Sequence, residues 1–182
     1  GAGTVTLAEN VVAGSALFEN DTTAYIINDS GGGETLTIND SIIFRGNADA
    51  TVNAVIAGSG SLTLGDENDG ISDGANLTLT GANTFTGGVN ITEGQLRITH
   101  SSALGTGAVS ITDDGANSNR EPSLELDAAG LVVMNDITIT NDGFFKRIRY
   151  DISGSGTTSE LAGTLTLEET LDRLVGIQAG SG

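Results

Sequence analysis

Residues 77–98, LTLTGANTFTGGVNITEGQLRI, decide the fold class of this 182-residue chain. Apolar and polar residues alternate at Leu77 and Leu79, and again at Leu96 and Ile98. Alternation of this kind is typical of a strand with one buried face. Gly and Asn interrupt the pattern every few residues, and these residue types favour turns. The stretch therefore predicts very short strands that are joined by tight corners.

The same alternation recurs along the whole chain. Further apolar pairs, each two residues apart, are Val5 and Leu7, Leu36 and Ile38, Leu62 and Leu64, Val89 and Ile91, Val109 and Ile111, Leu124 and Leu126, Ile137 and Ile139, and Leu165 and Leu167. Related sequences also recur, since GSGSLTL at 58–64 is similar to GSGTTSELAGTLTL at 154–167. Self-similarity indicates a repeat architecture, in which short strands are buried by stacking on their neighbours.

Two all-β architectures fit these strands. An antiparallel β-sandwich would join neighbouring strands as hairpins, whereas a parallel β-helix, or solenoid, would stack each strand on the one a coil earlier. Aromatic residues make up only 4% of the chain and Trp is absent, which favours a narrow solenoid core of Leu, Val and Ile. We expect a single β-helix domain over residues 1–182. Because the chain opens on Gly1, we also expect a segment of a longer repeat-containing chain.

The composition disfavours several classes of partner. The formal net charge is −17, with only seven Lys and Arg residues, so nucleic acid and anionic membrane surfaces are not expected to bind. Cys is absent, which rules out disulfides and thiolate metal sites. No apolar run approaches the roughly 20 residues that span a bilayer, so this chain is not expected to insert into a membrane.

The run at 58–111 is similar to a known family. Its segments LTLTGANTFTGG and ITEGQLRI resemble the passenger-associated repeat of bacterial autotransporters, with Phe85 where that pattern usually has Tyr. The resemblance implies a right-handed parallel β-helix that is exported and then displayed at the cell surface or released outside the cell. We therefore expect a noncatalytic structural or adhesive scaffold, secreted and acidic, without catalytic residues. The alternative is a glycan-binding or polysaccharide-degrading β-helix.

The segment FFKRIRY at 144–150 is the best candidate for ligand contact. It interleaves basic residues with aromatic rings, which could stack on sugars from a host or the environment. The candidate contact residues are Phe144, Lys146, Arg147, Arg149 and Tyr150. The alternative is a strand whose positions 144, 148, 150 and 152 form a buried face, with Lys146 as an exception on that face and the Arg residues paired to carboxylates.

Two further segments carry polar groups at expected corners. GDENDG at 65–70 places Asp66, Asn68 and Asp69 in one turn, and such oxygen-rich turns can bind calcium. The segment does not complete an EF-hand pattern, so a solvated corner is the favoured interpretation and no cofactor is otherwise expected. His100 is the only His, and we expect it at a solvated corner as well.

The two ends of the sequence resemble incomplete copies of the repeat. LTLEETLDRLVGI at 165–177 could form a capping helix, since Thr166 and Glu169 fit a capping box, or it could form another pair of strands. If the ends are uncapped, solenoid layers and strand edges remain open. We then expect end-to-end contact with copies of this chain or with adjoining repeats, which would produce a fibre or a longer rod.

Overall fold

The computed structural model describes residues 3–19, 22–65, 76–112, 121–141, 145–150, 158–169 and 175–179. All regular elements in this part of the chain are β-strands, and it contains no helix that could cross a membrane. The strands are β1 (Gly3–Leu7), β2 (Val11–Glu19), β3 (Tyr25–Asp29), β4 (Thr35–Arg45), β5 (Ala50–Val52), β6 (Val55–Ala57), β7 (Ser61–Leu64), β8 (Asn76–Leu79), β9 (Val89–Ile91), β10 (Gln95–Ile98), β11 (Val109–Ile111), β12 (Ser123–Leu126), β13 (Val132–Val133), β14 (Ile137–Asn141), β15 (Lys146–Tyr150), β16 (Glu160–Leu161), β17 (Leu165–Glu169) and β18 (Val175–Ala179).

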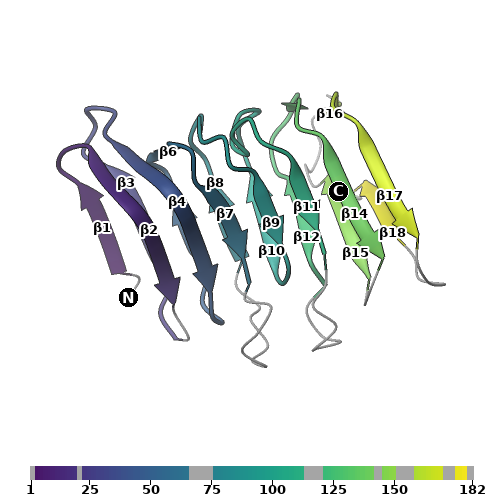
Figure 1. Cartoon of the computed structure of the whole chain (residues 1–182), viewed down its shortest axis with the longest axis horizontal. Coiled ribbons are helices and arrows are strands. Elements are labelled where there is room, and N and C mark those ends of the chain that lie inside the picture. Colours follow the sequence, from purple (N-terminus) through teal and green to yellow (C-terminus); the bar gives the residue numbers. More distant parts are fainter. Residues whose placement is uncertain are drawn as a thin grey trace.

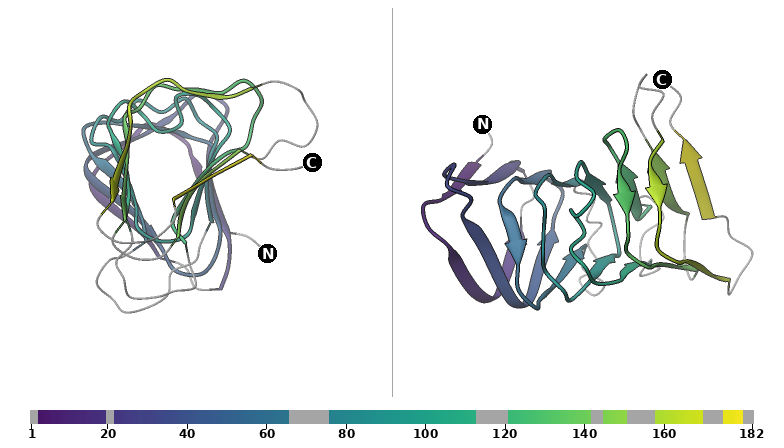
Figure 2. Two further views of the ribbon diagram at one scale, coloured as in Figure 1. Left: turned by 90° about the vertical axis from the view of Figure 1, so that its right-hand side faces the viewer. Right: turned by 90° about the horizontal axis from the view of Figure 1, so that it is seen from above.

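The strands form two long sheets that face each other across one core (Figure 1). Sheet A has the order β1-β3-β5-β8-β10-β12-β15-β18. Sheet B has the order β2-β4-β7-β9-β11-β14-β17, and β6 also pairs with β4. Every pairing among the described strands is parallel, and Figure 2 shows the coils superposed when they are seen along the axis. The predicted parallel β-helix is confirmed, and the antiparallel sandwich is wrong.

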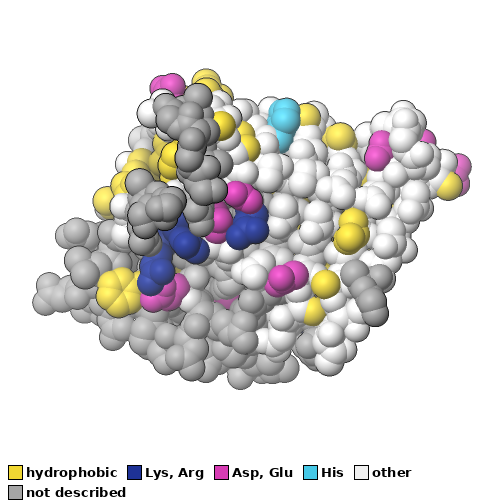
Figure 3. All heavy atoms as spheres, turned by 180° about the vertical axis from the view of Figure 1, so that it is seen from behind, with side chains coloured by type: hydrophobic (Ala, Val, Ile, Leu, Met, Phe, Trp, Pro, Cys, Tyr) yellow, Lys and Arg dark blue, Asp and Glu magenta, His cyan; other side chains and the backbone are white. Residues whose placement is uncertain are grey.

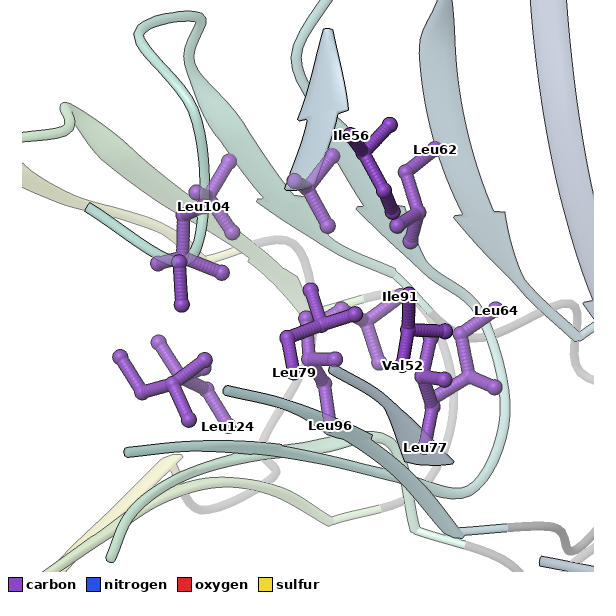
Figure 4. Close-up of a cluster of buried hydrophobic side chains, with 14 of the residues drawn as sticks. Val52, Ile56, Leu62, Leu64, Leu77, Leu79, Ile91, Leu96, Leu104 and Leu124 are labelled. Atoms are coloured by element: carbon purple, nitrogen blue, oxygen red, sulfur yellow. The ribbon is translucent and has the colours of Figure 1, made fainter. Parts of the chain in front are cut away.

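The register places apolar residues on apolar residues in successive coils. In sheet A, Leu77 pairs with Leu96, which in turn pairs with Leu124, and all three are fully buried. In sheet B, Leu64 pairs with Ile91, which pairs with Ile111. The two sets of side chains point toward each other and fill the space between the sheets (Figure 4). Because these ladders need one buried face on each strand, the alternation seen in the sequence is what specifies the coil.

One corner of the coil depends on a glycine. The 11-residue strand β4 pairs with β6 at its start and with β7 further along, so the coil that follows bends between β6 and β7. Gly58 lies in this bend with φ = 104°, and a Cβ atom there would lie 2.1 Å from the carbonyl oxygen of Ile38. Both the positive φ and the close backbone approach favour glycine. From β6 onward the solenoid therefore has a third side.

Buried asparagines support this third side. Asn83 is 3% exposed; its Oδ1 accepts a hydrogen bond from Ile56 N (2.8 Å) and its Nδ2 donates one to Ala103 O (2.7 Å). Asn135 is 7% exposed, and its Nδ2 donates to Gly107 O at 2.7 Å. These amide side chains satisfy backbone groups that the irregular corners leave outside the strand ladders. The small two-stranded sheet β13-β16 continues the same side.

Residues 165–169 and 175–179 form strands rather than the capping helix that Thr166 and Glu169 suggested. Leu165 and Leu167 of β17 pair in register with Ile137 and Ile139, so the alternating ladder prevails over the local capping signal. Leu167 is nevertheless 46% exposed, because β17 is the last strand of sheet B. The other end of the solenoid also exposes apolar side chains, at Val5, Val12 and Leu17.

Candidate functional site

The candidate segment lies in β15, between β12 and β18 of sheet A. The strand alternates, so that Arg147 and Arg149 are partly exposed while Lys146 is 1% and Ile148 4% exposed. Phe144 lies outside the described residues. The predicted contact residues therefore do not share one face. Arg147 and Arg149 can meet a ligand on the outer surface, whereas Lys146 faces the interior as the exception in a buried row.

The outer face of β15 continues a ladder of alternating charges from two earlier coils. Arg97 of β10 pairs in register with Glu125 of β12, and Glu125 pairs with Arg149. Arg97 Nη2 lies 3.3 Å from Glu125 Oε1, and Arg149 Nη1 lies 3.7 Å from Glu125 Oε2. The Glu125 side chain is only 2% exposed, while the two Arg side chains are 39% and 34% exposed. Two guanidinium groups thus cover a buried carboxylate.

Two further carboxylates pair with Arg147 and with Arg97. Arg147 forms an ion pair with Glu121, and Arg97 Nε lies 3.5 Å from Asp127 Oδ2. Arg97 Nε and Glu125 Oε2 are buried and lack a hydrogen bond, so charge rather than hydrogen bonding holds this part of the cluster. We call Arg97, Glu121, Glu125, Asp127, Arg147 and Arg149 the arginine face. Figure 3 shows its dark blue and magenta side chains gathered on one side of the molecule.

The sequence alternative of a buried row with its arginines paired to carboxylates agrees with these contacts, but it did not identify Arg97, Glu121 or Glu125. Arg97, Glu125 and Arg149 belong to three different coils, and they become neighbours only once the coils are stacked. A signal for this exists in the sequence, because each of these residues occupies the third position of its four-residue strand segment: QLRI, SLEL and RIRY. Aligning these segments would have placed the glutamate between the two arginines.

Tyr150 contributes to a groove beside the arginine face. The groove has a volume of about 330 Å³ and is lined by Leu126, Ile148, Arg149, Tyr150, Thr158, Ser159, Leu161 and Ile177. Its surface is mainly apolar, and Arg149 provides the charged group at its border. Such a site could hold an apolar group or one face of a sugar ring next to a guanidinium donor.

The remaining candidate positions are those of the calcium prediction and His100. Asp66, Asn68 and Asp69 lie outside the described residues, so the calcium prediction stays a prediction. His100 is exposed at a turn, as expected, where its Nδ1 accepts a hydrogen bond from Ser102 N at 3.1 Å. Among the described residues, no group of three or more His, Asp or Glu side chains is arranged to hold a metal ion.

Comparison with known proteins gives one informative similarity. The chain is 40% identical over 126 residues to the adhesin BmaC autotransporter of Brucella suis biovar 1 (strain 1330). The aligned region covers 68% of this chain but only 3% of that protein. No family model and no solved structure matches the chain. Together with the parallel solenoid, this similarity confirms the resemblance that residues 58–111 predicted.

Proposed function

We propose that this chain, an autotransporter passenger-like β-helix, is a noncatalytic extracellular scaffold in a bacterial surface adhesin. One observation carries the proposal: a parallel solenoid that is 40% identical, over 126 of its residues, to part of an adhesin autotransporter. The resemblance to exported passengers further supports a place at the cell surface or outside the cell. In this role the chain holds binding surfaces at a distance from the cell body.

The physical design of the solenoid suits such a role. Each coil contacts only its neighbours, so length is gained by adding coils without changing the core. The inner positions are restricted to residues such as Leu77, Leu96 and Leu124, which stack on one another. The outer positions between them are under weaker packing constraints and can carry different polar side chains. A rigid axis and variable outer faces are the properties that an adhesive scaffold needs.

Adhesion can be tested with inert beads that carry the purified chain. We expect these beads to attach to host cells or matrix-coated surfaces more than beads that carry an unrelated protein of the same size and net charge. The matched protein matters because a charge of −17 alone alters how a bead interacts with surfaces. Equal attachment of the two bead types across a panel of surfaces would contradict the adhesive role.

The proposal includes end-to-end contact with adjoining repeats or with further copies. At one end Val5 is 50% exposed and in register with the buried Ile27, and at the other end Ile177 is 65% exposed and in register with the buried Ile148, on the edge strands β1 and β18. Apolar layers and unpaired strand edges favour the addition of another coil. Because the two ends differ, the contact would be heterologous and could extend into a fibre.

Assembly is tested by light scattering during size-exclusion chromatography, over a concentration series, and by electron microscopy. We expect rods that lengthen with concentration in the parent chain and shorten in Val5→Asp, which places a charge in the proposed contact. Met134→Asp is the matched control, because Met134 is 71% exposed on the side of the solenoid. A monomer at every concentration would argue against self-assembly.

Glycan binding at the arginine face is a second candidate function. Its support is the gathering of Arg97, Arg147 and Arg149 on one face of an otherwise strongly acidic chain, beside the groove at Tyr150. A glycan array should then show binding that is lost in Arg147→Ala. Arg45→Ala is the control, because Arg45 also pairs with a carboxylate, Glu19, but on sheet B. Equal binding by both variants would argue against this face.

A further inference from the structure

A second groove crosses three successive coils. Its volume is about 500 Å³, and we call it the coil-gap groove. It is lined by Ala82, Asn83, Thr84, Ser101, Ser102, Gly105, Thr106, Val132, Met134 and Asn135. These residues belong to the side of the solenoid that includes β13, and all of them are described. None of them was predicted from the sequence to contact a ligand.

The coil-gap groove exists because one coil turns more tightly than its neighbours. Ala103 N donates to His100 O at 3.0 Å and Gly105 N donates to Ser102 O at 3.1 Å, so this segment forms turns instead of a strand. Consequently β13 pairs with β16 on one side only. On the other side Val132 N donates to Ser101 Oγ at 3.0 Å, and Met134 makes no hydrogen bond within the described structure. The space left beside β13 is the groove.

The polar groups of the coil-gap groove are uncharged and face it from several coils. Thr84, Ser101, Ser102 and Thr106 provide hydroxyl groups, which can both donate and accept hydrogen bonds. Asn135 is 7% exposed, and its Nδ2 donates hydrogen bonds to Gly105 O and Gly107 O. No hydrogen bond to its Oδ1 is present among the described residues. Because its amino group is held by these two carbonyls, the amide is fixed in orientation and can present its oxygen to a ligand as an acceptor.

Apolar side chains complete the lining. Val132 and Met134 are two residues apart on the same face of the chain, and they are 39% and 71% exposed. Met is flexible and polarisable, which suits contact with ligands of irregular shape. The lining contains no Asp, Glu, Lys or Arg, although 17% of the chain is charged. The volume lies within the range of about 300–1,000 Å³ that is usual for small-molecule sites.

We propose that the coil-gap groove binds an uncharged oligosaccharide. Sugar hydroxyls match the hydroxyls of Ser101, Ser102 and Thr106 and the amide oxygen of Asn135, while the C–H face of a sugar ring can pack on Met134. An anionic sugar is disfavoured, because the groove lacks a cation and the chain carries a net charge of −17. The site is distinct from the arginine face, and the inference goes beyond the adhesive role proposed above.

The test is an amide NMR titration of the whole chain with cellotetraose, maltotetraose and chitotetraose, with trigalacturonate as the charged comparator. We expect the amides of Met134, Asn135 and Thr106 to shift with at least one uncharged sugar and not with trigalacturonate. Binding should weaken at least tenfold in Ser102→Arg, which fills the groove, and in Met134→Glu, which removes the apolar surface on which the sugar ring packs. Leu17→Glu is the matched control, since Leu17 is 53% exposed on β2.

Three outcomes would overturn the inference. They are an absence of shifts with all three uncharged sugars, shifts confined to β15, and unchanged affinity in both groove variants when their spectra show an intact fold. Both substituted positions are exposed, so the fold should survive the substitutions. Adhesion of the coated beads without saccharide binding would overturn this inference alone and leave the adhesive role supported.

Discussion

Replacing Leu79 by Ala tests the stacked core most directly. Leu79 is 0% exposed and lies in register between Val52 of β5 and Ile98 of β10. Parallel ladders on both sides hold its backbone in place, so the cavity left by the substitution cannot collapse easily. We expect the free energy of unfolding to fall by about 3–5 kcal/mol, toward the upper part of the range for buried Leu→Ala changes. Since domains are typically stable by about 5–15 kcal/mol, this loss is large.

The matched control is Thr78→Ala, on the opposite face of the same strand. Thr78 is partly exposed and pairs with Thr51 and Arg97 on the outer surface, so its replacement should cost less than about 1 kcal/mol. Urea unfolding followed by far-UV circular dichroism measures both variants, and equal slopes with urea concentration are needed for the comparison. Equal losses in the two variants would refute the assigned burial, and with it the stacked-layer account of stability.

Three further predictions concern single residues. Gly58→Ala should lower the thermal midpoint by several degrees, because the new Cβ meets Ile38 O at 2.1 Å and φ is positive; differential scanning calorimetry measures this. Asn83→Leu should cost about 2–4 kcal/mol in urea unfolding, because Ile56 N and a second backbone group lose their buried partner. The pKa of Glu34 is lowered because its carboxylate accepts hydrogen bonds from backbone N–H groups, of which its own N–H has the largest effect. The resulting stabilisation is present above the unfolded pKa of about 4.3 and is lost as the pH falls below that value. The protection factors of the amides in the adjacent turn, which correct for the intrinsic pH dependence of exchange, should therefore fall in acid, and this fall should be absent in Glu34→Gln.

The sequence was sufficient to predict the fold because the core signal is local. The alternation at Leu62 and Leu64, or at Leu77 and Leu79, predicts which face of each strand is buried. This prediction does not require knowing which strand pairs with it. A short strand cannot bury its apolar face alone, so the strands bury their apolar faces by stacking in successive coils. The parallel β-helix and the expected turn at His100 follow from this signal.

The features that the sequence did not predict depend on which residues of successive coils are paired. Asn76 pairs with Gln95, which follows it by 19 positions in the sequence, whereas Gln95 pairs with Ser123, which follows it by 28 positions. With coils of such unequal length, sequence spacing does not reveal that Glu125 meets two arginines. The coil-gap groove was also invisible, because it arises where one coil turns and its neighbour forms β13. At residues 165–169, a local capping signal competed with a ladder whose other strand lies almost 30 residues earlier.

The direction of the hydrogen bonds has a mechanical consequence. In this solenoid the ladders run along the long axis, from β1 at one end to β18 at the other (Figure 1). A pulling force between the two ends therefore opens the strand pairs one after another, as in a zipper, and does not shear all of them together. Peeling off the coil from Tyr25 to Ala50 replaces a rise of about 4.8 Å by roughly 85 Å of extended chain. A cell held by such a rod would be tethered by a molecule that lengthens in steps and dissipates work before it breaks.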